Sequence, residues 1–274
     1  MKTNTSTVVL GFGAMGSALI KGWVNNRLIP ASQITAVDID VAKLKKAVAV
    51  LKIKTQTDPV QSLRKASLVL LAVKPQQMRD ILAAVGYSIP PETLVVSIAA
   101  GISTTQIEKA LSQGCPVVRV MPNTPALLGV GMAAVAGGKR AKTRHVQKVL
   151  TLFSAVGKAV EVREDQMDLV TAISGSGPAY FFHMVETMIA SGVKRGLEPA
   201  IARMLVSQTA LGAARMILET GKSPTELRIQ VTSPGGTTQS ALATMAKNGF
   251  EKTMDAAIQS AVLRGAELRR ISES

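Results

Sequence analysis

The 274-residue sequence predicts an α/β fold in which a parallel-sheet domain is followed by an all-α domain. Three observations support this prediction. From Thr7 to Glu164, short β-branched runs alternate with helix-like stretches, as in a parallel sheet covered on both faces. From Asp165 onward the strand pattern ends and apolar residues recur with helical spacing. Apolar residues make up 47% of the chain, which supports a large buried core.

The elements of the first domain follow from these runs. Strands are expected at residues 7–10, 34–38, 51–55, 68–73, 94–98, 117–121, 132–136 and 160–164. Helices are expected at residues 14–26, 41–50, 76–85, 104–111 and 143–155. We therefore assign residues 1–164 to a first domain and residues 165–274 to a second.

Proline, glycine and capping signals divide the second domain into helices. One long helix begins near Pro178 and ends at Gly196, and the next begins at Pro199 and ends at Gly221. Ser223–Glu226 has the pattern of a capping box. Two further helices are expected at residues 237–247 and 251–271. The many small and apolar residues of these helices predict packing against a second copy of the chain.

A glycine-rich turn follows the first predicted strand. Gly11, Gly13 and Gly16 form the pattern G-x-G-x-x-G between a strand and a helix. In such turns the first glycine permits the tight turn, the second lets a pyrophosphate approach the backbone, and the third lets the helix pack closely on the strand. The pattern predicts a Rossmann-like domain that binds NADH or NADPH; the alternative is a glycine turn without a ligand. The candidate cofactor-binding residues of the turn are Gly11, Phe12, Gly13, Ala14, Met15 and Gly16.

Asp38 ends the second predicted strand and bears on which dinucleotide is bound. A carboxylate at this position accepts hydrogen bonds from a ribose 2′-hydroxyl and repels a 2′-phosphate, which favours NADH. The alternative is an acidic residue that only stabilises the following helix N-terminus. Lys43, Lys45 and Lys46 follow closely and bring positive charge near the site, so the preference stays open.

Further candidates lie where other strands end, because parallel sheets bind ligands at their carboxyl edge. They are Ala72, Val73, Lys74, Pro75, Ala99, Ala100, Gly101 and Asn123. The small residues Ala99–Gly101 leave room for a flat ring, and Asn123 can present its amide to the nicotinamide or its ribose. The alternatives are a surface ion pair for Lys74 and a turn-forming role for Asn123.

A second glycine signature lies between two predicted helices, at Ser233–Thr238. The N–H groups of Gly236, Thr237 and Thr238 are expected to converge at a helix N-terminus, with donors added by the Ser233 and threonine hydroxyls. Such a turn binds a carboxylate or a phosphate. The alternative is an elaborate helix cap. A similar Gly/Ser turn at Ser174–Pro178 is a candidate hinge or cap.

Composition excludes several classes of protein. The single cysteine, Cys115, cannot form an internal disulfide, and His145 and His183 lie far apart without cysteine neighbours, so no metal site is expected. No apolar run is long enough to cross a membrane, and no secretory signal is recognised, so we expect a cytoplasmic protein. The formal charge of +14 fits solvated helix faces and attraction of anionic small molecules. Nucleic-acid binding is not expected, because aromatic residues are too few for base stacking.

Taken in order, these motifs resemble the pyrroline-5-carboxylate reductase family. The resemblance rests on Gly11–Gly16 (GFGAMG), Ala72–Pro75, Asn123–Pro125, Ser174–Tyr180 (SGSGPAY) and, above all, Ser233–Thr238 (SPGGTT). It spans nearly the whole chain. It implies hydride transfer from NADPH or NADH to the C=N bond of 1-pyrroline-5-carboxylate, which gives L-proline in the last step of proline biosynthesis.

The resemblance also implies roles for individual residues. Ser233 and the N–H groups of Gly236, Thr237 and Thr238 would hold the substrate carboxylate, and the Thr238 side chain would bond the ring nitrogen as the catalytic residue. Glu164 matches a weaker family position near the substrate. No strong general acid is needed, because an imine nitrogen can be protonated before the hydride arrives. His183 is expected to be a packed or interface residue.

The family further implies a homodimer through an all-α dimerisation domain, often joined into a decamer of five dimers. Its active site lies between the cofactor domain of one subunit and the helical domain of the other. Two departures from the family pattern are present. Gly16 replaces a frequent alanine, and we expect either residue to pack; Asp38 favours NADH, whereas the family generally favours NADPH.

Two other functions fit parts of the sequence. A β-hydroxyacid dehydrogenase has the same two-part layout, and its general base is usually a lysine of the helical domain. Lys194 is the nearest candidate, but its position is also typical of a helix C-terminus. A dinucleotide-sensing or nucleic-acid-binding regulator would rest on the positive charge alone.

Overall fold

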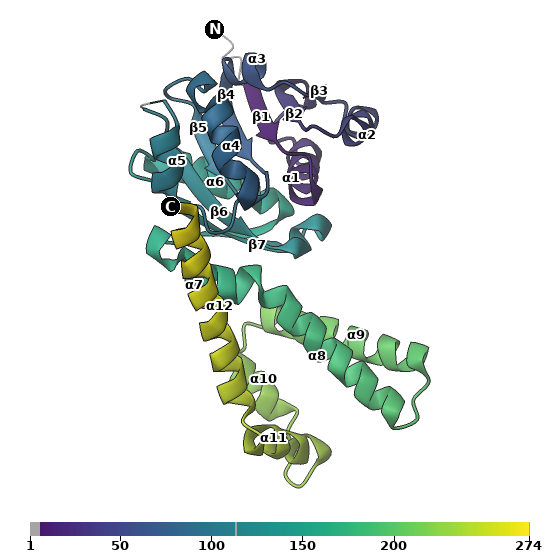
Figure 1. Ribbon diagram of the computed structural model, residues 1–274. Coiled ribbons are helices and arrows are strands. Elements are labelled where there is room, and N and C mark those ends of the chain that lie inside the picture. Colours follow the sequence, from purple (N-terminus) through teal and green to yellow (C-terminus); the bar gives the residue numbers. More distant parts are fainter. Residues whose placement is uncertain (1–5, 113, 274) are drawn as a thin grey trace. The chain divides into compact units, whose positions relative to one another are not determined.

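The computed structural model describes residues 6–112 and 114–273 and confirms the predicted fold class (Figure 1). Its contacts divide the chain into two compact units, which we describe separately. Unit 1 comprises Met1–Ser176 with Ala261–Ser274, and unit 2 comprises Gly177–Ser260. The domain boundary expected after residue 164 stays a prediction.

An eight-stranded sheet with the order β3-β2-β1-β4-β5-β6-β7-β8 forms the centre of unit 1. The strands are β1 Ser6–Leu10, β2 Ile34–Val37, β3 Lys54–Gln56, β4 Ala66–Leu71, β5 Leu94–Ser97, β6 Val117–Pro122, β7 Gly131–Gly137 and β8 Gly157–Glu161. In the parallel register of the central strands, Val8 lies beside Thr35 of β2 and Val69 of β4. The strand order reverses at β1, which creates the crevice where such sheets bind ligands.

Strand β7 departs from the predicted parallel sheet, since it pairs with β6 in the antiparallel direction. Residues 123–130 join the two strands and contain only the short 3₁₀ helix Thr124–Leu128. A parallel pair needs a crossover of a dozen or more residues, so this connection is too short for one. Strand β8 begins earlier than expected, at Gly157, where a side chain would overlap the backbone of Gly131.

Helices cover both faces of the sheet. Those of unit 1 are α1 Ala14–Asn25, α2 Val41–Leu51, α3 Val60–Leu63, α4 Pro75–Val85, α5 Thr104–Ala110, α6 Thr143–Phe153, α7 Met167–Val170 and the end of α12 Phe250–Glu273. Val9 packs in a cluster with residues of α1, α2 and α6. Its neighbours Val8 and Leu10 pack in a second cluster with residues of α3, α4 and α5. Successive side chains of a strand point to opposite faces, so the two clusters lie on opposite sides of the sheet.

Unit 2 is entirely helical and contains α8 Gly177–Lys194, α9 Pro199–Glu219, α10 Pro224–Gln230, α11 Thr237–Lys247 and the beginning of α12. The capping box predicted at Ser223 is confirmed. These helices bury little of their apolar surface. Phe181 is 70% exposed and Leu218 is 70% exposed, and Ala202 is the single buried hydrophobic side chain of this fully described unit.

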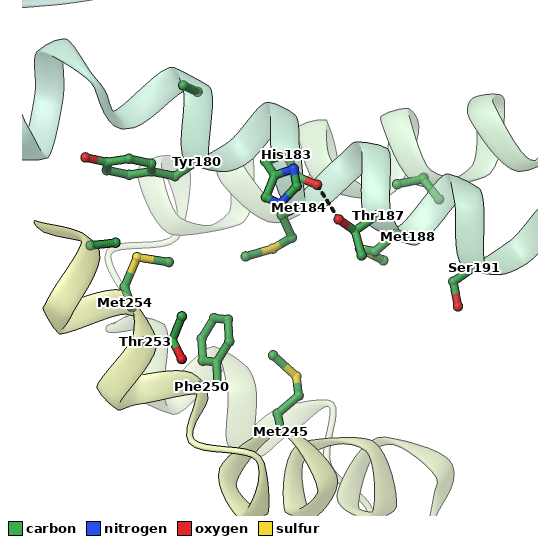
Figure 2. A pocket seen from close by; sticks show the side chains of 13 residues that line it. Tyr180, His183, Met184, Thr187, Met188, Ser191, Met245, Phe250, Thr253 and Met254 are labelled. Carbon is green, nitrogen blue, oxygen red and sulfur yellow. Dashed lines mark hydrogen bonds between the residues drawn. The ribbon is translucent and has the colours of Figure 1, made fainter.

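Unit 2 also contains an apolar hollow of about 890 Å³ between its helices. Figure 2 shows methionine side chains of α8, α11 and α12 that line it together with Phe250. Its lining includes Tyr180, His183, Met184, Met188, Met245 and Met254. An apolar hollow of this size in a helical unit with so few buried side chains indicates a surface that another polypeptide covers.

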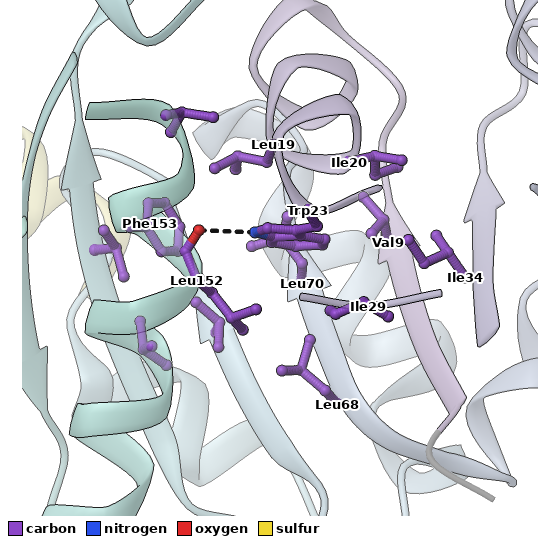
Figure 3. Close-up of a cluster of buried hydrophobic side chains, with 14 of the residues drawn as sticks. Val9, Leu19, Ile20, Trp23, Ile29, Ile34, Leu68, Leu70, Leu152 and Phe153 are labelled. Atoms are coloured by element: carbon purple, nitrogen blue, oxygen red, sulfur yellow. Dashed lines mark hydrogen bonds between the residues drawn. The ribbon is translucent and has the colours of Figure 1, made fainter. Parts of the chain in front are cut away.

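Trp23 is the largest fully buried side chain of the main cluster and joins α1 to α6 (Figure 3). It is 1% exposed. Its indole Nε1 donates a hydrogen bond to the backbone oxygen of Leu152 at 2.9 Å. Because α1 follows the glycine turn, Trp23 helps to fix the helix whose N-terminus faces the carboxyl edge of the sheet.

Trp23→Phe removes this buried hydrogen bond and leaves a space in the core. We expect a loss of about 1–3 kcal/mol in the free energy of unfolding, seen as a Tm lower by about 2–10 °C. The measurement is thermal unfolding at a fixed protein concentration. Tyr87→Phe is the control, since Tyr87 is 81% exposed. Equal Tm values for Trp23→Phe and the unsubstituted protein would contradict this role.

Candidate cofactor and substrate sites

The glycine turn of unit 1 is shaped by close contact between backbones. Gly11 has φ +98°, and a Cβ at this position would lie 2.5 Å from the backbone oxygen of Ala72 at the end of β4. Only glycine fits both conditions. Gly13 is the N-cap of α1 and its Cβ direction is open, with no heavy atom within 4 Å. The N-terminus of α1 is therefore accessible to a phosphate, as the cofactor prediction requires.

Gly16 gives a different result from the one expected. A Cβ at Gly16 would overlap the backbone oxygen of Gly11 and would lie 3.4 Å from the Cβ of Ala72. The expectation that alanine packs equally well at this position is therefore wrong for this backbone. An alanine here would require the turn to move away from α1.

Asp38 holds the glycine turn against the start of α2. Its Oδ2 accepts a hydrogen bond from the N–H of Phe12 at 2.7 Å, and its Oδ1 accepts one from the N–H of Asp40 at 2.9 Å. The N-cap of α2 is Asp40, which accepts from the N–H groups of Ala42 and Lys43. Hydrogen bonds from the Lys43 backbone and side chain lower the pKa of Asp40. Asp38 thus adds to the geometry of the turn, while Asp40 caps the helix.

The hydrogen bonds of Asp38 connect to a hollow that sequence reasoning missed. The N–H of Asp38 donates to the backbone oxygen of Gln56 at 3.4 Å, at the end of β3. There a polar hollow of about 320 Å³ is lined by Gln56, Thr57, Asp58 and Gln61. Its signal in the sequence is a polar run directly after a strand of the parallel sheet. Its place beside Asp38 makes it a candidate for the adenosine end of a dinucleotide.

The remaining cofactor candidates follow β4 and β5, which are neighbours in the sheet. Lys74 is exposed and makes no ion pair among residues 6–112 and 114–273, so the alternative of a surface ion pair has no partner there. Ala99 is buried, and Gly101 has φ +73°. The structure therefore places the loops that begin at Ala72 and Ala99 side by side at the carboxyl edge.

Asn123 has partners within the protein for both ends of its amide. Its Oδ1 accepts from the N–H of Met132 at 2.8 Å, and its Nδ2 donates to the oxygen of Ser174 at 3.2 Å. Ser174 belongs to a π-helical turn, Thr171–Gly175, which the sequence did not predict. These bonds favour the structural interpretation of Asn123; its contact with the cofactor stays a prediction.

In unit 2 the turn Ser233–Thr238 leads directly into α11. Gly235 has φ +72°, and its N–H donates to the side chain of Gln239 at 2.6 Å. The N–H of Gly236 donates to the oxygen of Ser233 at 3.0 Å, so it is not free for a ligand as expected. No side chain caps α11 at Gly236. The N–H groups of Thr237 and Thr238 have no acceptor among the residues that the structure describes, so these two remain for an anion.

Glu164 lies in unit 1 and is bonded within it. Its Oε1 accepts from the N–H of Thr104 at 3.1 Å and from the Arg119 guanidinium at 3.3 Å. Arg119 is 1% exposed, and its position in an apolar strand is the signal that sequence reasoning missed. The other Glu164 oxygen, Oε2, is buried without a partner among the described residues. Its place near the substrate stays a prediction.

Two other candidates, Lys194 and His183, lie on helix α8. Lys194 lies in the last turn of α8, where a cation stabilises the helix, so the dehydrogenase interpretation gains no support from it. His183 is exposed in this single chain and lies 3.3 Å from Glu186. Within residues 6–112 and 114–273, no group of three or more potential ligands is arranged for a metal ion. No described helix is long and apolar enough to span a membrane.

Comparisons with known proteins agree with the geometry. The family described as pyrroline-5-carboxylate reductase dimerisation matches residues 164–268, and the family described as NADP oxidoreductase coenzyme F420-dependent matches residues 6–101. The pyrroline-5-carboxylate reductase of Methanosarcina acetivorans is 41% identical over 258 residues, with 94% of each chain covered. That of Pseudomonas aeruginosa is 41% identical over 260 residues, with 94% of this chain and 95% of the other covered.

Solved structures show the same similarity over the whole chain. The pyrroline-5-carboxylate reductase of Coxiella burnetii has a TM-score of 0.86 at 33% identity and covers 97% of this chain and 98% of its own. The pyrroline carboxylate reductase of Plasmodium falciparum, solved with NADP bound, has a TM-score of 0.85 at 28% identity and covers 97% and 99%. With its glycine turns, its helical unit and these relatives taken together, the chain belongs to the pyrroline-5-carboxylate reductase family.

Proposed function

We propose that this protein reduces the C=N bond of 1-pyrroline-5-carboxylate with NADH or NADPH and releases L-proline, the last step of proline biosynthesis. The observation that carries the proposal is the Ser233–Thr238 turn, whose Thr237 and Thr238 N–H groups have no acceptor within residues 6–112 and 114–273. A helix N-terminus with free donors suits the carboxylate of this substrate. The direct test follows the absorbance of the reduced nicotinamide with this imine as substrate.

Residues of unit 1 hold the cofactor in this proposal. The Gly11–Gly16 turn receives the pyrophosphate at the open N-terminus of α1, and Ala72–Pro75 with Ala99–Gly101 bound the nicotinamide. When bound, the nicotinamide supplies the hydride that reduces the imine carbon. Asp38 places a carboxylate at the ribose end, next to the end of β3 and its hollow, whereas the Asp40 carboxylate is paired with Lys43 at 3.3 Å. The charge of Asp38 favours a 2′-hydroxyl over a 2′-phosphate, while Lys43 brings positive charge close by, so we expect both NADH and NADPH to serve as cofactor.

Residues of unit 2 orient the substrate. The N–H groups of Thr237 and Thr238 bind the carboxylate with help from the Ser233 hydroxyl, and Gly236 gives the turn its shape. The Thr238 hydroxyl bonds the ring nitrogen and fixes which face of the imine is presented. No strong acid is required, because the imine nitrogen takes its proton before reduction. Catalysis is then mainly positioning of the carbon and the hydride donor.

A homodimer completes the protein in this proposal. The chain carries the family's dimerisation region, and unit 2 exposes Phe181, Phe182 and the methionine-lined hollow of Figure 2. Burying this surface against a second copy stabilises helices that bury almost nothing alone. We further propose that the active site joins the cofactor unit of one subunit to the helical unit of its partner, and that five dimers form a decamer. The location inferred is the cytoplasm, since the single cysteine, Cys115, is buried and free.

Thr238→Ala removes the hydroxyl that orients the ring nitrogen. We expect kcat/KM for the imine to fall by about 10–1000-fold, by analogy with the loss of one catalytic donor. Steady-state kinetics with the imine measure this change. Thr244→Ala is the control on the same helix, because the Thr244 hydroxyl bonds only its own helix, to Ser240. Full activity in Thr238→Ala would remove Thr238 from the mechanism.

Asp38→Asn removes one negative charge at the ribose end and keeps one oxygen as a hydrogen-bond acceptor. We expect the ratio of kcat/KM for NADPH to that for NADH to rise about 10-fold or more, because repulsion of the 2′-phosphate is relieved. Asp80→Asn is the control, since Asp80 is an exposed carboxylate of α4. An unchanged ratio would show that Asp38 serves only to hold the backbone of the glycine turn.

Met188→Glu places a charge in the hollow of unit 2, where Met188 is 48% exposed in the single chain. Covering an unpaired carboxylate costs about 3 kcal/mol or more, so the dissociation constant of the dimer should rise about 100-fold. Sedimentation equilibrium over a dilution series measures it. Met188→Leu keeps the surface apolar and should remain dimeric. A dimer of unchanged affinity in Met188→Glu would place the interface elsewhere.

A further inference from the structure

The last turn of α12 is hydrogen-bonded to the loop that follows β5. The Ser272 hydroxyl lies 2.9 Å from the backbone oxygen of Gly101 and 2.6 Å from that of Arg269 in its own helix. It has one proton to donate, to either oxygen. Whichever oxygen receives that proton, the Ser272 oxygen can accept a hydrogen bond from Nε2 of Gln106 at 2.8 Å. All of these residues belong to unit 1, so the contact is internal to that unit.

Gln106 connects this hydrogen bond to the geometry of the loop. It is the N3 residue of α5, and its Oε1 accepts from the N–H of Ser103 at 2.6 Å in a capping box. The same amide therefore fixes the start of α5 with its oxygen and holds Ser272 with its nitrogen. The end of α12 is therefore hydrogen-bonded to the segment between β5 and α5 at both Gly101 and Gln106.

Packing contacts support the same arrangement. A Cβ at Gly101 would lie 3.4 Å from the Cβ of Leu268, so α12 lies directly against this loop. Arg269 forms an ion pair of 3.1 Å with Asp168 of α7, whose carboxylate is largely buried. At Gly265 a Cβ would lie 3.6 Å from the Cβ of Asp168, which shows close approach along two turns of α12. The end of α12 is thus held by the loop after β5 and by α7.

From these contacts we infer that Ser272 is a positioning residue for the nicotinamide, acting through Gln106 and Gly101. The inference rests on the proposed function, in which Ala99–Gly101 bounds the nicotinamide. Gly101 has φ +73° and no side chain, so contacts from neighbouring residues must hold the loop in this conformation. Ser272 touches the loop and does not itself contact the reacting atoms.

The test compares Ser272→Ala with Ser272→Thr, which keeps the hydroxyl, and with Ser154→Ala as the matched control. Among the residues that the structure describes, the Ser154 hydroxyl bonds only the backbone of its own helix, at Leu150. For each protein we would measure Tm, kcat with the imine, the affinity for ADP-ribose and the fluorescence of bound NADH. ADP-ribose contains the adenosine end and the pyrophosphate and lacks the nicotinamide, so it reports on general damage to the cofactor site.

For Ser272→Ala we expect kcat to fall about 3- to 10-fold, which corresponds to one lost hydrogen bond, and the fluorescence of bound NADH to change. Affinity for ADP-ribose should stay within about twofold, and Ser272→Thr should restore kcat. A kcat within about twofold of the unsubstituted protein, an equal loss of ADP-ribose affinity, or no rescue by threonine would overturn the inference.

The fluorescence measurement separates this inference from the proposed function. If the unsubstituted protein reduces no 1-pyrroline-5-carboxylate, the proposed substrate is wrong. The inference then stands when Ser272→Ala alters the fluorescence of bound NADH with ADP-ribose affinity unchanged, and it fails when the fluorescence matches that of the unsubstituted protein.

Discussion

The contact between the backbone of Gly11 and the carbonyl of Ala72 is the constraint on which the proposed cofactor site depends. It brings the ends of β1 and β4 together with no side chain between them. Because the backbones are this close, α1 begins at the carboxyl edge with its first N–H groups facing outward. Asp38 then bonds the N–H of Phe12, which ties the same turn to β2. A larger residue at Gly11 or Gly16 would separate these parts, so the glycines determine the site through packing as well as through flexibility.

The helical unit differs from the sheet unit. In one copy, its N–H donors at the start of α11 and many of its apolar side chains have no partner among the described residues. In the described part of the chain, the N–H groups of Thr237 and Thr238 at the start of α11 have no acceptor, and large apolar side chains such as Phe181 stay exposed. Exposed apolar surface drives association, whereas unpaired donors at a helix N-terminus bind anions. Folding and dimerisation are therefore linked in this unit, and substrate binding would be linked to both if the proposed site is correct. Its stability depends on protein concentration, because no comparable core forms within one copy.

Sequence patterns predicted most of the fold, because alternation of strand and helix periods is a local property. The antiparallel pairing of β7 was missed because direction depends on the length of the link at residues 123–130 and not on the strand itself. The candidate site was predicted where glycines impose the geometry, as at Gly11 and Gly235. The prediction was less accurate where the position of a side chain depends on a partner far along the chain. The partner of the Asn123 amide is Ser174, and the positions of Arg119 and Ser272 depend on contacts between distant segments.

The overall charge of the protein and the local charge of Asp38 have opposite effects on NADPH relative to NADH. The formal charge of +14 attracts any anion, and it attracts NADPH more than NADH because NADPH carries the additional phosphate. This field is screened over about 8–10 Å at physiological salt. In the proposed site the Asp38 carboxylate would lie at the ribose itself, where a charge at about 4 Å outweighs a screened distant field. Discrimination between the two cofactors must therefore be local, whereas the overall charge raises the rate at which either cofactor and the anionic imine meet the protein. A basic surface and the proposed carboxylate at the ribose are compatible for this reason, since the first would govern encounter and the second would govern selection.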